Sequence, residues 1–122
     1  MPYFHSFWPS DNTDPLGRIK IQWGFSHFFP ANTISAHVTR MGKRHLKMAI
    51  DVALSGAFGI DLALDKATAE ERAQIADAVK LYKERIRPLV MHGELYRLVS
   101  PYESPLASLS YVSTDKQKAV VY

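Results

Sequence analysis

The chain has 122 residues, of which 47% are hydrophobic and 22% charged, with a formal net charge of +3. This composition predicts a soluble chain with room for one ordinary hydrophobic core, and it excludes a disordered tail. The absence of cysteine excludes a disulfide framework and a thiolate metal site, and no apolar run approaches the roughly 18 residues of a membrane span.

Residues 3–8 form an aromatic-rich segment at the start of the chain, Tyr-Phe-His-Ser-Phe-Trp. Aromatic enrichment followed by a proline and a polar stretch is typical of a short buried strand that ends in a loop. We therefore predict a strand over 3–8 that ends at Pro9.

A helix is predicted over about 15–28. Thr13 or Asp14 can cap its first turn, and Pro15 suits the first helical position because proline lacks an N–H to donate. Pro30 closes this segment. The spacing also allows Arg18 to pair with Asp14 across one helical turn, as a surface contact.

Two further strands and a helix follow. Residues 34–39 alternate well enough to predict a second strand, and apolar residues spaced by three and four predict an amphipathic helix over 43–56. Residues 57–64 are apolar except for Asp61. We predict a third strand there, with this carboxylate at or just past its end.

The clearest helix is predicted over 68–87. Thr68 and Glu71 have the spacing of a capping box, and apolar residues lie on one face of the segment that follows. Pro88 is expected to end this helix.

The last part of the chain has a different texture. Three strand-like segments are separated by turn-rich stretches, at 94–100, 107–113 and 119–122. Upstream of them, strand and helix alternate three times over 3–92, which is the signature of a parallel sheet covered by helices. A complete β/α barrel needs eight such units and roughly 250 residues, so this chain has room for about three.

A set of ordered motifs identifies a family. Residues 8–14 read Trp-Pro-Ser-Asp-Asn-Thr-Asp and precede a helix that contains Ile-Gln-Trp, and further blocks lie at 29–31, 36–38, 51–59 and 93–101. These blocks resemble glycoside hydrolase family 36, the microbial α-galactosidases. The resemblance extends from about residue 6 to 113.

The resemblance implies an architecture and an activity. Residues 1–93 would be the last three βα units of a (β/α)8 TIM barrel, and residues 94–122 the first antiparallel strands of a C-terminal β-sandwich. The chain would be a fragment of a retaining α-galactosidase that acts on α-galactoside oligosaccharides. It would need no cofactor or metal, and the full-length enzyme is expected to be a homo-oligomer.

By the same resemblance, Asp11 is the catalytic acid/base, and Trp8 and Ser10 join it in binding substrate. A retaining glycosidase uses two carboxyl groups, one to attack the anomeric carbon and one to protonate the leaving oxygen and then activate water. From local sequence alone, Asp11 and Asp14 could equally cap the following helix, and Trp8 could be a core residue.

The nucleophile of the family lies in a Lys-Trp-Asp motif, which does not occur in this chain. Asp61 is another carboxylate at a predicted strand end, but by family position it belongs to the final strand and is not the attacking group. The five histidines lack the i, i+4 spacing of a helical zinc site.

Two other interpretations stay open. The chain could be a truncated, non-catalytic folding unit that self-associates or packs on a partner, because three βα units leave raw sheet edges. The basic run at 43–47 could bind phosphate, although such a run at a helix start is usually a solvated edge, so we expect no nucleic-acid partner and no membrane. The N-terminal residues carry no signal-peptide pattern, which leaves localisation open and favours the cytoplasm.

Overall fold

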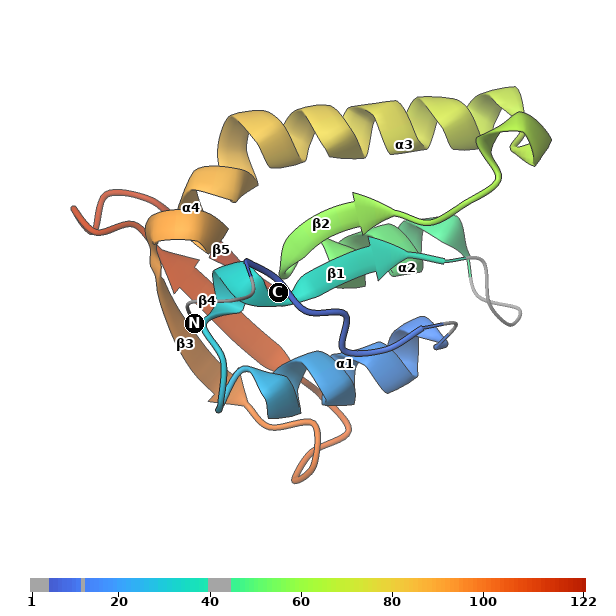
Figure 1. Ribbon diagram of the computed structural model, residues 1–122. Helices are drawn as coiled ribbons and strands as arrows, with labels where there is room; N and C mark the ends of the chain where they lie inside the picture. Colours follow the sequence, from blue (N-terminus) through green and yellow to red (C-terminus); the bar gives the residue numbers. More distant parts are fainter. Residues whose placement is uncertain (1–4, 12, 40–44) are drawn as a thin grey trace.

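The computed structural model describes residues 5–11, 13–39 and 45–122 (Figure 1). Two parallel strands, β1 (Ser35–Val38) and β2 (Ala57–Ile60), lie at its centre. Their register pairs Ser35 with Ala57 and Val38 with Ile60. Both strands confirm the sequence prediction, and each is shorter than predicted.

The predicted first strand is reduced to a single bridge in the part of the chain that the structure describes. Phe7 bridges to Ile34 in parallel, donating to the Thr33 carbonyl at 2.9 Å and accepting from the Ser35 N–H at 3.1 Å. The start of that predicted strand, residues 3 and 4, lies outside the described residues. The chain thus runs beside β1 in the predicted direction but pairs with it at one point.

Helix α1 (Pro15–Phe25) begins as predicted. The Asp14 carboxylate accepts the Leu16 N–H at 2.9 Å, so Asp14 is the N-cap. The helix ends three residues early because the chain turns at Ser26, whose hydroxyl donates to the Trp23 carbonyl. The expected surface pair of Arg18 with Asp14 is wrong, because the Arg18 guanidinium turns inward to other partners described below.

Helix α2 (Leu46–Ala53) connects the two strands, with the 3-10 turn η1 (Ala31–Thr33) before β1 and η2 (Leu64–Lys66) after β2. The predicted start of α2 at residues 43 and 44 lies outside the described residues. The hydrophobic core lies between β1, α2 and the long helix after β2, and these buried residues make up its central part: Val38, Ala53, Leu54, Ile75, Tyr82 and Ile86.

Helix α3 (Ala69–Leu81) starts with the predicted capping box, with both reciprocal hydrogen bonds between Thr68 and Glu71. The prediction that Pro88 ends this helix is wrong. A π turn, η3 (Tyr82–Ile86), follows α3 and leads directly into α4 (Arg87–His92). The π turn restarts the helical ladder, which places Pro88 in the first turn of α4, where its missing N–H has no helical partner to lose.

The last three strands form an antiparallel sheet in the order β3–β4–β5, as predicted: β3 (Glu94–Val99), β4 (Ser108–Val112) and β5 (Ala119–Val121). This meander packs at the end of the parallel sheet where β1 and β2 begin, while the arrows of both strands point away from it (Figure 1). The Tyr111 hydroxyl donates to the Ser55 carbonyl at 2.6 Å, and the Tyr122 hydroxyl donates to the Leu54 carbonyl at 2.8 Å. Tyr111, which is buried, and Tyr122, which is partly buried, therefore fasten the meander to the C-terminal end of α2.

Across the described ranges, none of the helices combines the length and the apolar character that a membrane crossing requires.

Candidate functional site

Two carboxylates lie at the end of the sheet opposite the meander. Asp61 directly follows β2, and its N–H donates to the Val38 carbonyl at 2.9 Å. Asp11 lies four residues beyond the Phe7 bridge, in an exposed bend of the loop that leads to α1. Both carboxylates act electrostatically on the same two buried side chains, Arg18 and His37. Asp11 and Asp61 therefore lie at the same end of the sheet, as two residues that follow parallel strands should.

Arg18 is the group that links this loop to the helix behind it. Its side chain is only 2% exposed, although it lies on an amphipathic surface helix. The guanidinium donates to the Thr13 carbonyl at 3.1 Å and also to the Asp11 carbonyl. Burial lowers the pKa of Arg18, and the carboxylates of Asp61 and Asp11 oppose that shift. A cation is thus held inside the protein, next to the loop that carries Asp11.

His37, in the middle of β1, lies against this cation. One guanidinium nitrogen of Arg18 is 3.1 Å from Nδ1 of His37, and another is 2.6 Å from Nε2. A neutral imidazole has only one nitrogen that can accept, so one of the two contacts is a hydrogen bond and the other is close packing. Burial, followed by the charge of Arg18, lowers the pKa of His37. Both effects favour the neutral form of the imidazole.

Trp8 packs on the ring of His37. The two rings are stacked, with centroids 3.7 Å apart and an interplanar angle of 23°. Trp8 is 53% exposed, so one face of the indole packs on the histidine while much of the ring remains open to solvent. Trp8 is therefore not the buried core residue of one sequence interpretation, and its contact with substrate, the other interpretation, stays a prediction.

The hydroxyl of Ser10 is buried and has no hydrogen-bond partner among the described residues, and the same is true of the hydroxyl of Thr39, just after β1. Buried hydroxyls in proteins nearly always have a partner. Ser10 directly precedes Asp11 in the loop before α1, and Thr39 directly follows Val38, the last residue of β1. The structure therefore leaves hydrogen-bonding capacity unused at this end of the sheet.

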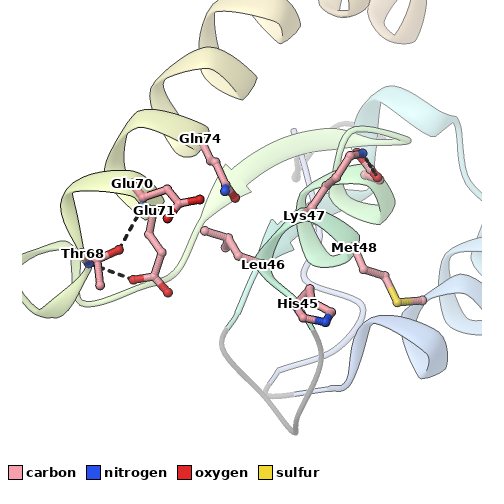
Figure 2. A pocket seen from close by; sticks show the side chains of 9 residues that line it. His45, Leu46, Lys47, Met48, Thr68, Glu70, Glu71 and Gln74 are labelled. Carbon is pink, nitrogen blue, oxygen red and sulfur yellow. Dashed lines mark hydrogen bonds and ion pairs between the residues drawn. The ribbon is translucent and has the colours of Figure 1, made fainter.

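The loop 8–11 brings the three residues of the predicted site together. A separate hollow of about 640 Å³ lies between the N-terminal turns of α2 and α3 (Figure 2). Glu70 and Glu71 line it opposite His45 and Lys47, and Lys47 pairs with Asp51 at 2.5 Å.

This second hollow is a poor phosphate site, because carboxylates line it and its lysine is already paired. The other part of the basic run, Lys43 and Arg44, lies outside the described residues. In the ranges that the structure describes, no three His, Asp or Glu side chains are grouped so as to hold a metal ion.

Sequence reasoning missed Arg18 and His37. A signal was present for Arg18, because it falls on the stripe Pro15, Arg18, Gln22, whose spacings of three and four mark the buried face of α1. A cation on a buried helical face requires internal acceptors. No comparable local signal marks His37, which is buried because β1 is covered on both faces.

Three comparisons place the chain among known proteins. The sequence profile of the Melibiase family matches residues 1–93. Alpha-galactosidase AgaA of Geobacillus stearothermophilus is 38% identical, over 98% of this chain and 17% of its own length.

Among solved structures, the GH36 alpha-galactosidase AgaB of the same organism superposes with a TM-score of 0.89 and 40% identity, covering 99% of this chain and 17% of that one. An AgaA variant in complex with stachyose superposes with a TM-score of 0.85 and 40% identity, covering 92% of this chain and 16% of that one. The chain therefore spans about one-sixth of the length of the relatives it matches.

Proposed function

The chain belongs to the Melibiase family, and we propose that it supplies the general acid/base, Asp11, of a retaining α-galactosidase that hydrolyses terminal α-galactosyl residues of oligosaccharides. One observation carries the assignment of Asp11. Helix α1 is capped by Asp14, whereas the Asp11 side chain is exposed and its backbone carbonyl is the group that accepts from Arg18. The capping role that competes with catalysis is thus already taken by another residue.

The chemistry requires a second carboxylate about 5 to 5.5 Å from the first, which attacks the anomeric carbon while Asp11 protonates the leaving oxygen. We assign this nucleophile to polypeptide outside these 122 residues and not to Asp61. In this proposal residues 1–93 are the last three βα units of a (β/α)8 TIM barrel, and 94–122 open a C-terminal β-sandwich. The parallel pair β1–β2 between helices and the antiparallel meander support that division.

The substrate class follows from the relatives. AgaA, 40% identical in its stachyose complex, binds an α-galactoside oligosaccharide, and we propose the same class here. Trp8 offers a half-exposed ring beside Asp11, and Ser10, whose unpaired hydroxyl is buried, lies next to Asp11 in the same loop. An exposed aromatic face suits a sugar, which is apolar on its ring faces. The full-length enzyme is expected to be a homo-oligomer.

The proposal can be tested in full-length AgaB whose matching segment is replaced by residues 1–122 of this chain. AgaB is 40% identical over 99% of this chain. In this exchange enzyme, Asp11→Ala should slow hydrolysis most for substrates with poor leaving groups, by about 10² to 10⁴. Methyl α-galactoside and a dinitrophenyl α-galactoside provide the two extremes. Asp14→Ala is the matched control, because it removes a cap carboxylate from the same loop.

Azide distinguishes the two steps of the reaction. If Asp11 is the acid/base, the glycosyl-enzyme still forms from the activated substrate, and azide attacks its anomeric carbon in place of water. The bond to the nucleophile carboxylate breaks, and the product keeps the starting configuration as α-galactosyl azide. Equal losses for both leaving groups with no azide product would remove the acid/base role from Asp11, and robust turnover by the 122-residue chain alone would remove the need for an outside nucleophile.

A further inference from the structure

We propose that Arg18 is a positioning residue that sets the orientation of the Asp11 carboxylate by holding the backbone of its loop. The inference rests on the proposed function of Asp11. It concerns a residue that touches the peptide groups of the loop and not the reacting atoms.

The Arg18 side chain holds the backbone of this loop at two points. The guanidinium donates to the carbonyls of Asp11 and Thr13, and the Asp11 carbonyl also accepts the Thr13 N–H at 2.9 Å. Two loop carbonyls are therefore turned toward the guanidinium. Turning the Asp11 carbonyl inward leaves its carboxylate on the exposed side.

The contacts of Arg18 fix its own position as well. Helix α1 holds its backbone, and His37 packs against the guanidinium from β1, with Trp8 stacked on the imidazole. The loop is thereby connected to the central sheet as well as to the helix. A displacement of the guanidinium would move the Asp11 peptide with it.

Burial makes this arrangement specific. Because Arg18 is only 2% exposed, water does not compete with its guanidinium for the two loop carbonyls. A buried cation is tolerated only where acceptors and carboxylates surround it. Well-packed apolar side chains often match buried ionic groups in stability, so stability alone does not require an arginine here. The planar guanidinium can reach both carbonyls at once, whereas a lysine ammonium acts as a single point charge.

The test uses Arg18→Met and Arg18→Lys in the exchange enzyme described above. Lys20→Met is the matched control, because it removes one positive charge from the exposed face of the same helix. We would measure kcat/KM for the methyl and the dinitrophenyl α-galactoside, the melting temperature, and the recovery of activity when guanidinium ion is added to Arg18→Met.

We expect Arg18→Met to lower kcat/KM for the methyl glycoside by about tenfold to hundredfold more than for the dinitrophenyl glycoside, because misplacing a catalytic group by about 1 Å costs about 10² in rate. Added guanidinium ion should restore part of this loss. Arg18→Lys should keep the charge and still show the same dependence on leaving group, and Lys20→Met should behave as the parent enzyme.

Equal losses for both substrates, with a lowered melting temperature and no recovery by guanidinium, would show that Arg18 only supports the fold and would overturn the inference. If Arg18→Met does not fold, Arg18→Lys decides, since a parent-like dependence on leaving group in that variant would also overturn it. The Asp11→Ala variant separates the two proposals. If Asp11→Ala shows no dependence on leaving group, the proposed function is wrong and so is the inference. If Asp11→Ala shows the expected dependence but Arg18→Met behaves as the parent enzyme, only the inference is wrong.

Discussion

The two ends of the β1–β2 sheet differ in what covers them. At the end where the strands begin, the meander covers the sheet, and tyrosine hydroxyls donate to the carbonyls of Leu54 and Ser55, just after α2. The amide nitrogen of Gln22, whose Oε1 accepts from Ser55 there, still has no hydrogen-bond partner among the described residues. At the end where the strands stop, the hydroxyls of Ser10 and Thr39 are likewise buried without partners. The meander closes the first end, which serves stability, and leaves the second open to a ligand or to further polypeptide.

The strongest way to break the closed end is Tyr111→Ala. Tyr111 is 2% exposed, packs edge-on against Tyr122 and donates to Ser55, so its loss leaves a cavity and an unpaired carbonyl. We expect the free energy of unfolding to fall by about 3 to 5 kcal/mol, measured by urea denaturation of the chain. Tyr111→Phe keeps the ring and should cost about 1 kcal/mol. A loss below that of Tyr111→Phe would mean that the meander is not fastened by this side chain.

Gly93 tests the junction between α4 and the meander. A Cβ at this position would lie 2.5 Å from the Leu89 carbonyl oxygen and 2.7 Å from that of Val112, and neither backbone group can move easily. Gly93→Ala should therefore lower the free energy of unfolding by about 1 to 3 kcal/mol. Gly59→Ala is the matched control on β2, where the added Cβ would meet His37 at an ordinary 3.6 Å. Similar denaturation midpoints for both variants would contradict this account.

Thr68→Ala addresses the open end, where the capping box of α3 lies. Removing the hydroxyl that accepts the Glu71 N–H should cost about 1 kcal/mol. Thermal unfolding followed by circular dichroism would measure it. A loss as large as that of Tyr111→Ala would reverse our assignment of the stabilising end.

The smallest expected effect is the pH dependence that comes from His37. Its pKa is lowered in the fold by burial and by Arg18, with the Asp11 backbone, Asp61 and the Asp11 carboxylate acting in the opposite direction. As pH falls through the ordinary histidine value of about 6.5, the unfolded chain binds a proton that folded His37 does not, so stability is lost toward acid. Denaturation midpoints of the parent and of His37→Asn between pH 7.5 and about 5 would show it. The exposed His27→Asn should keep the parent's slope, and an unchanged slope in His37→Asn would rule His37 out as the source.

Much of the fold could be predicted from the sequence because its elements carry local signals. The capping box at Thr68 and the turn-rich stretches between the last strands needed no tertiary information. The first strand was predicted over 3–8 from aromatic content, but pairing depends on the neighbouring backbone, which among the described residues of this segment meets it at Phe7 alone. Pro88 was expected to end a helix because proline usually does. The π turn that allows the helix to continue has no signature in the residue types.

The site was predictable in part for a related reason. Parallel strands share a direction, so Asp11 and Asp61 had to lie at the same edge of the sheet once both were placed after strands. The pairing of Arg18 with His37 joins residues 19 positions apart, on a helix and a strand. Local patterns gave Arg18 a surface partner one turn away, and only the packing of α1 on the sheet turns its side chain inward.

The π turn at 82–86 has a consequence for how this chain can change length. The π turn takes up one residue more than an α-helical turn, so a single deletion within 82–86 would give a regular helix that keeps Leu89 and Val90 on the inner side of α4. An α-helix rotates by about 100° per residue, so the same deletion within α3 would rotate Ile75, buried on its inner face, away from the core. Single-residue deletions are therefore better tolerated in the π turn than in α3.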